Sequence, residues 1–180
     1  MVKKILTIIS FVVCLQILVL TALTFIGCEE ADRTVIETQR VNSVEEVWEP
    51  DQESIIALAK TLWGECRGVK SKTHQAAVAW CVLNRLDSKK FKGESVLEIC
   101  SAPHQFDGYS DSHPVSDELY DLAKDVLKRW YRERCGETGV GRVLPNDYYF
   151  FIGDGIENHF SQEWKSTNYW AWELPTPYED

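Results

Sequence analysis

The stretch LWGECRG, residues 62–68, places a carboxylate where it could act as an acid. Upstream of it, apolar residues recur with the spacing of a helix that buries one face: Ile55, Leu58, Ala59 and Leu62. At about 100° per residue, Glu65 falls on the border of this apolar stripe. Partial burial raises the pKa of a carboxyl, which suits a general acid working near neutral pH. The alternative is a partly solvated glutamate that pairs with Arg67 or with a more distant base.

Cysteines and histidines are the other candidates for chemistry. Cys66 lies in the middle of the apolar stripe, where a cysteine is usually a small inert hydrophobe and not a nucleophile. A disulfide between Cys66 and Cys81 would join the first two predicted helices, and two buried free thiols are the alternative. Cys100, His104 and His113 show no paired CxxC or HExxH spacing. We therefore expect no metal and no cofactor.

Helices must position the candidate acid. The spacing predicts a first helix from Asp51 or Glu53 to Cys66, a second from Ser71 or Thr73 through HQAAVAWCVLNRL, a short one at ESVLEIC, and a long one from Ser116 to about Arg134. Eight consecutive apolar residues, 76–83, leave the second helix no solvated side, so we expect it to be central and buried. DYYFFIG, residues 147–153, is the one convincing strand. The pattern predicts a mostly helical α+β domain with a central helix and a small β element.

The first 28 residues are interpreted as a membrane anchor or a signal segment. Lys3 and Lys4 precede an apolar stretch, residues 5–27, that is long enough to span roughly 30 Å of hydrocarbon as a helix. The positive-inside rule then places the rest of the chain outside the cytoplasmic membrane. The alternative is a lipoprotein signal with Cys28 as the acylated residue.

Residues 29–53 are interpreted as an acidic linker, which leaves residues 54–180 as the working domain. The linker holds nine acidic residues against two arginines, so it carries most of the chain's net charge of −9. No basic cluster is strong enough to neutralise phosphates. We therefore do not expect the protein to bind nucleic acid.

Aromatic side chains are abundant, with seven tryptophans and seven tyrosines. Several aromatic residues fall on loops, helix borders or strand ends: Trp63, Phe106, Tyr109, Tyr148, Tyr149, Trp164, Trp170 and Trp172. Rings at such places can stack on the faces of sugars, and packing in the core is the alternative for part of them. A carboxylic acid beside an aromatic-rich cleft fits glycoside cleavage, in which the acid protonates the leaving oxygen.

Five segments together resemble the spore-cortex-lytic (SleB/CwlJ-type) cell wall hydrolase family: LAKTLWGECRG, AVAWCVLNRL, HQF, the tyrosine-rich strand and NHF. The resemblance covers roughly residues 54–160. It implies a lysozyme-like fold around a central buried helix, and peptidoglycan glycan strands (the MurNAc-GlcNAc backbone) as the substrate. It implies that Glu65 is the catalytic glutamate. The predicted substrate contacts are Trp63, Gln105, Phe106, Tyr149 and His159.

Members of this family are often lytic transglycosylases, which need a single glutamate. The glutamate first donates a proton to the glycosidic oxygen, and then as a base it helps the substrate's own 6-hydroxyl close an anhydro ring. A hydrolase needs a second carboxylate, for which Asp107 and Asp111 near HQF are candidates. The alternative to an enzyme is a non-catalytic, membrane-tethered protein that binds peptidoglycan. The intact Glu65 argues against this alternative.

Overall fold

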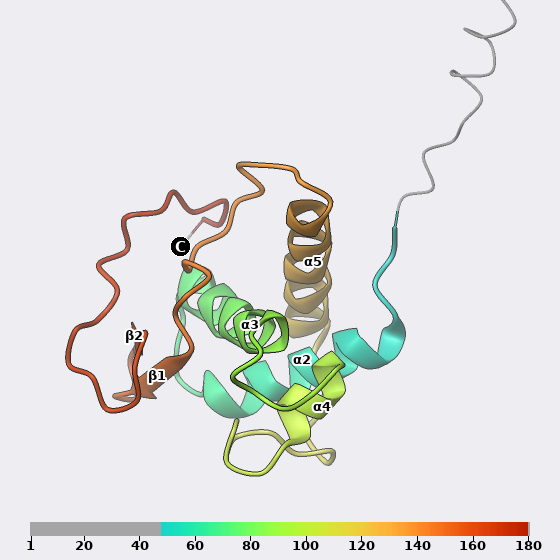
Figure 1. The fold of residues 1–180 in the computed structure, drawn as a ribbon. Coiled ribbons are helices and arrows are strands. Elements are labelled where there is room, and N and C mark those ends of the chain that lie inside the picture. Colours follow the sequence, from blue (N-terminus) through green and yellow to red (C-terminus); the bar gives the residue numbers. More distant parts are fainter. Residues whose placement is uncertain (1–47, 180) are drawn as a thin grey trace, which may run out of the picture. The chain divides into compact units, whose positions relative to one another are not determined.

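The computed structural model describes residues 48–179 (Figure 1). These residues form α2 (Gln52–Glu65), α3 (Lys72–Asp87), α4 (Val96–Ser101), α5 (Asp117–Arg134), β1 (Phe150–Gly153) and β2 (Asn158–Ser161). The two strands pair antiparallel as a hairpin, with Phe151 opposite Phe160. The predicted mostly helical α+β domain is confirmed. The second strand, which contains the NHF segment, was missed by the sequence analysis.

The three longer helices begin where a polar side chain can accept a backbone N–H of the first turn. Asp51, Ser71 and Ser116 each accept the N–H three residues further on, at 2.8, 3.1 and 3.3 Å. Such N-caps satisfy donors that have no partner within the helix. The predicted starts of these three helices are therefore confirmed.

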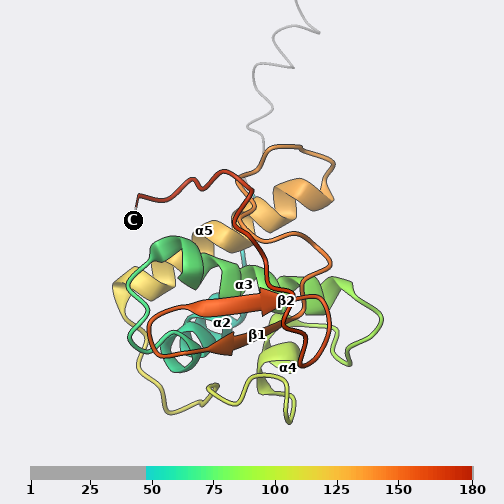
Figure 2. The same cartoon turned by 90° about the vertical axis from the view of Figure 1, so that its left-hand side faces the viewer.

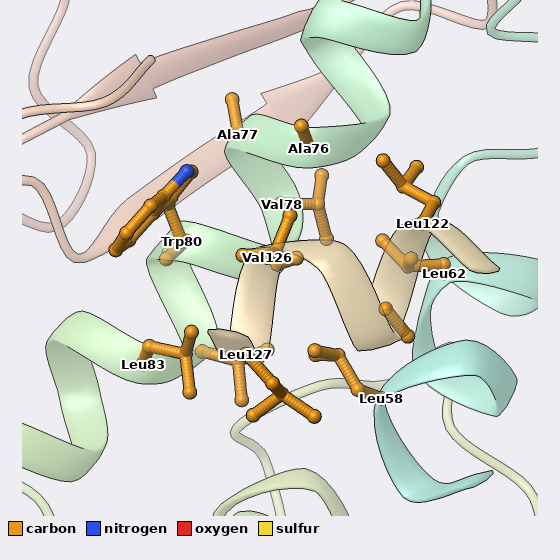
Figure 3. Packing of buried hydrophobic residues seen from close by; sticks show 14 of the residues in the cluster. Leu58, Leu62, Ala76, Ala77, Val78, Trp80, Leu83, Leu122, Val126 and Leu127 are labelled. Atoms are coloured by element: carbon orange, nitrogen blue, oxygen red, sulfur yellow. The ribbon is translucent and has the colours of Figure 1, made fainter. Parts of the chain in front are cut away.

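The central helix is α3, as predicted. Every residue from 76 to 83 is 0% exposed, so all sides of this segment are covered. The close view of the core in Figure 3 shows side chains from three helices meeting there, among them Leu58, Leu62, Trp80, Leu83, Val126 and Leu127. Removal of this apolar surface from water is the main term that holds the domain together.

The hairpin packs on the same core. In Figure 2 the hairpin faces the viewer. Phe160 of β2 is buried in the hydrophobic core around α3. Asn84, near the end of α3, is 2% exposed and ties the loop before β1 to the helix. Its Nδ2 donates to the carbonyl oxygens of Pro145 and Tyr148, both at 2.8 Å, while its Oδ1 accepts from Arg142 at 2.7 Å. The hairpin therefore approaches the helices along a fixed path.

The compact unit begins at Trp48, ahead of the boundary expected at residue 54. The Trp48 ring stacks on Tyr131 of α5, with centroids 4.1 Å apart and planes 6° from parallel. The Glu49 carboxylate pairs with Lys124 at 2.9 Å and with Lys128 at 2.5 Å. The end of the predicted acidic linker is thus bound to a basic side of α5.

No helix within residues 48–179 is long and apolar enough to cross a membrane. The span predicted at residues 5–27, the possible acylation site at Cys28 and the first part of the acidic linker lie outside the described residues.

Replacement of Asn84 by alanine should lower the free energy of unfolding by about 2–4 kcal/mol, because it leaves two buried carbonyls without their donor and opens a cavity. Chemical denaturation measures this change. Asn146→Ala, at an exposed asparagine of the same loop, is the matched control and should change stability by less than about 0.5 kcal/mol. Equal effects of the two substitutions would show that the bonds of Asn84 do not hold the loop.

Candidate active site

Glu65 is the last residue of α2, at the point where the helix leaves the core. Its neighbours Leu62 and Cys66 are buried, whereas the Glu65 side chain is half-buried at the edge of the core. The backbone N–H of Gly108, in the loop between α4 and α5, donates to Glu65 Oε1 at 2.7 Å. The loop therefore holds one of the two carboxyl oxygens of Glu65.

Two glycines allow this bond to form. A Cβ on Gly64 would meet the carbonyl oxygen of Gly108 at 1.7 Å, far inside any van der Waals contact. A Cβ on Gly108 would lie 2.9 Å from Cδ of Glu65. The loop can therefore approach the end of α2 only because both positions lack a side chain.

Burial raises the pKa of the Glu65 carboxyl above its ordinary value. The negative charge of Asp107 acts in the same direction, while the Gly108 N–H and the Arg85 guanidinium lower the pKa of Glu65. Because burial is the largest of these effects, the carboxyl keeps its proton to a higher pH than a solvated glutamate does. That is the property required of a general acid near neutral pH.

Arg85, the residue after Asn84, connects two segments that surround Glu65. It is 6% exposed, and its guanidinium donates to the carbonyl oxygens of Tyr149 at 2.7 Å and Gln105 at 2.5 Å. The guanidinium also lies 4.3 Å from the ring centroid of Phe106. A buried cation is stable only with such partners, so Arg85 holds the loop after α4 and the approach to β1 together.

A cleft of about 690 Å³ opens beside Glu65. Its charged lining residues are Glu65, Arg85, Lys90, Lys92 and Asp107, and its aromatic ones are Phe91, Phe150, Phe151 and Trp164. His104 and Gln105 also line the cleft. Of the predicted site residues, the structure thus brings Glu65, Gln105 and Asp107 together around one space. An acid, several cations and several flat rings can protonate and bind a polar, anionic substrate there.

Of the five predicted substrate contacts, only Gln105 lines the cleft, and of the predicted aromatic residues only Trp164 does. Phe106 is 5% exposed and lies beneath the cleft, between Arg85 and Phe151. Tyr149 contributes its carbonyl oxygen to Arg85, and its ring lies 4.9 Å from Lys90 Nζ. Trp63 is partly exposed on α2 and does not line the cleft.

His159 and Asp111 are also engaged elsewhere. His159 Nε2 lies 3.2 Å from Asp154 Oδ2 and 4.0 Å from Glu157 Oε1, at the exposed turn of the hairpin. Within the described residues these three side chains are the one group close enough to share an ion, with ligand atoms within 4.8 Å of one another. Asp111 accepts from the Tyr109 hydroxyl at 2.6 Å and lies 3.6 Å from Lys60 Nζ.

Cys66 and Cys81 are buried free thiols, which is the second of the two alternatives for this pair. Burial raises the pKa of Cys66 to about 12 and that of Cys81 to about 12. The thiolate is the reactive form of cysteine, and a pKa this high leaves almost none of it at neutral pH. Cys66 therefore acts as a packing residue behind Glu65.

Several residues of the cleft were not predicted from the sequence. Arg85 lies two residues after the apolar stretch 76–83, on a helix that this stretch predicts to be buried, and a cation at such a place must be buried and paired. That signal could have identified Arg85 as an organiser of the site. Lys90, Lys92 and Phe150 carry no comparable local signal, since long-range packing alone brings them to the cleft.

The comparisons with known proteins give one match. The family model described as Cell Wall Hydrolase matches residues 70–178, which is more than half of the chain. The matched segment includes Arg85, Asp107 and both strands, and it begins just after Glu65. No curated protein and no solved structure matches the chain.

Gly64→Ala should lower the free energy of unfolding by about 1–3 kcal/mol, because the new Cβ forces the Gly108 loop away from α2. Helix propensity alone predicts the opposite, a gain of up to ~1 kcal/mol. Chemical denaturation gives the sign, and faster amide hydrogen exchange at Gly108 should accompany the loss. The control is Gly136→Ala, in which no atom lies within 4 Å of the new Cβ. This substitution strains the backbone locally, since φ is +93°, but it should leave the hydrogen exchange of Gly108 unchanged. A stabilised Gly64→Ala protein would contradict the close contact.

Proposed function

The chain belongs to the cell wall hydrolase family, and we propose that it cleaves the glycan backbone of peptidoglycan with Glu65 as the proton donor. Membership of the family supports a hydrolase that acts on peptidoglycan. The observation that carries the assignment of Glu65 is its half-buried carboxyl, with a raised pKa, in the wall of a cleft of about 690 Å³. Asp107 is the one other carboxyl in the described lining of this cleft.

The geometry of Glu65 suits proton transfer. Gly108 N–H donates to Oε1, so the other oxygen, Oε2, is available to carry the proton. This proton passes to the glycosidic oxygen as the bond from that oxygen to the anomeric carbon breaks. The carboxylate that remains accepts a proton from the nucleophile that attacks the anomeric carbon.

We propose that this nucleophile is the 6-hydroxyl of the same sugar, which makes the enzyme a lytic transglycosylase with a single acid/base. Of the two candidate second carboxylates, Asp111 is held by Tyr109 and Lys60 and does not line the cleft. Asp107 lines the cleft, and its negative charge helps Glu65 to keep its proton. Hydrolysis with Asp107 as the second carboxylate is the alternative.

The charges in the cleft support an anionic substrate. Arg85, Lys90 and Lys92 line it together with Glu65 and Asp107. The peptide stems of peptidoglycan, which are attached to muramic acid, carry carboxylates that such cations attract. The cations therefore favour binding of the muramic acid unit beside the acid, whereas a neutral polysaccharide gains nothing from them.

We further propose that the domain works outside the cytoplasmic membrane. The support is the sequence of the first 28 residues, with two lysines before a long apolar stretch. Either a membrane anchor or acylation at Cys28 would keep the enzyme near the inner side of the wall.

Glu65→Gln should abolish the release of muropeptides from isolated cell walls, since an amide of the same size cannot donate the proton. The variant should be at least as stable as the parent at neutral pH, because the raised pKa of Glu65 makes the parent lose stability as the pH rises from the ordinary pKa of a glutamate to the raised one. Thermal unfolding tests the second expectation. Glu53→Gln, at an exposed glutamate of the same helix, is the control and should retain activity. Undiminished activity in a folded Glu65→Gln protein would refute the assignment.

Mass spectrometry of the products separates the two mechanisms. Lytic transglycosylation leaves anhydro ends, whereas hydrolysis leaves reducing ends.

Asp107→Asn should keep activity at acidic pH but lose it at a lower pH than the parent on the alkaline side. The reason is that Asp107 raises the pKa of Glu65, so its removal lets Glu65 release its proton sooner. The pH profile of muropeptide release measures the shift. Asp111→Asn, outside the cleft, should leave the profile unchanged. Complete inactivity of Asp107→Asn at every pH would instead favour a two-carboxylate hydrolase.

A further inference from the structure

A second, smaller hollow adjoins the cleft on the hairpin side, and we call it the side pocket. It has a volume of about 230 Å³. Phe150, Phe151 and Trp164 line both the cleft and the side pocket. The two spaces therefore adjoin at these three aromatic side chains.

The side pocket collects large apolar side chains that are exposed to water. Trp164 is 68% exposed, Ile152 59% and Tyr169 39%. The Trp164 ring lies 5.8 Å from that of Phe150, at an angle of 60°, so one of its faces remains open. Exposed apolar side chains that gather around one hollow mark a binding surface, whereas scattered ones do not.

The chemistry of the side pocket differs from that of the cleft. No carboxylate lines it, and its one cation is Lys165. Ser161 and Ser166 complete the lining beside the rings. The Ser161 hydroxyl is buried and donates to the Glu163 carbonyl oxygen, whereas the Ser166 hydroxyl accepts from the Asn168 N–H and can still donate. Flat rings with a few hydroxyls suit the apolar face and the hydroxyls of a sugar, but they offer no acid or base for bond cleavage. The side pocket is therefore suited to binding alone.

The backbone beside both spaces is held in an uncommon conformation. Lys165 in the side pocket has φ +60° and His104 in the cleft has φ +63°. Residues other than glycine rarely adopt this left-handed region, and where they do, the position often belongs to a functional site. The side pocket shares this property with the cleft.

We propose that the side pocket is a saccharide subsite, which binds an N-acetylated hexosamine of the same glycan strand further along from the sugars beside Glu65. Trp164 stacks on the face of this sugar, and the Ser166 hydroxyl donates to its polar edge. The subsite rests on the proposed function, because it assumes that the cleft holds a glycan. The subsite makes the enzyme prefer long glycan strands over short glycan fragments.

The test is a binding measurement with oligomers of N-acetylglucosamine and the inactive Glu65→Gln protein, so that no cleavage occurs. Calorimetry should show that the hexasaccharide binds more tightly than the disaccharide. In Glu65→Gln/Trp164→Ala the affinity for the hexasaccharide should fall about tenfold, which corresponds to ~1.4 kcal/mol, and clearly more than the affinity for the disaccharide, since Trp164 also lines the cleft. Trp63→Ala in the same background removes a partly exposed ring outside both spaces and should leave both affinities unchanged.

Two outcomes would overturn the subsite. One is an unchanged affinity of the Trp164→Ala protein for the hexasaccharide. The other is displacement of the hexasaccharide by a free stem peptide in the parent but not in the Trp164→Ala protein, which would assign the side pocket to the peptide. Both outcomes are distinct from failure of the proposed function, which is judged by turnover in the protein with Glu65 intact.

Discussion

The site depends on the hydrogen bonds that the buried guanidinium of Arg85 donates. Arg85 lies at the end of the buried segment 76–85 of helix α3, and it donates to one carbonyl of the loop after α4 and to one that precedes β1. These two segments supply lining residues of the cleft, among them Gln105 and Phe150. Because a buried cation without partners costs several kcal/mol, both segments must stay where the guanidinium can reach them. The buried charge of Arg85 therefore maintains the shape of the cleft.

The same cation opposes the acid that it helps to place. Arg85 lowers the pKa of Glu65, as does the Gly108 N–H, yet the net direction is upward because burial is the larger effect. Removal of water from the carboxyl thus does more than any single partner. The close contact between Gly64 and Gly108 contributes to that removal, since the loop lies directly on the end of α2. The missing side chains of Gly64 and Gly108 therefore contribute to the raised pKa of Glu65.

The sequence predicted the helices well because their signals are local. The caps, the apolar stripe of α2 and the continuous apolar stretch of α3 can each be recognised within a few residues. The cleft was predicted only in part, because its lining depends on strand register. Ile152 lies opposite His159, and Phe151 lies opposite Phe160. A shift of one residue would exchange the exposed and the buried member of the NHF segment, and nothing local in the sequence fixes that choice.

Phe106 shows how the two halves of the site are kept in register. It precedes Asp107 and Gly108, the residues that act on Glu65, and its ring lies 6.3 Å from that of Phe151. The Phe151 ring in turn lies 5.5 Å from that of Phe160 in the core. The loop that contacts Glu65 and the hairpin that carries the exposed rings are thus separated by a row of three aromatic side chains, of which Phe106 and Phe160 are buried. Because packed rings deform little, this row fixes the distance between Glu65 and the exposed rings of the hairpin.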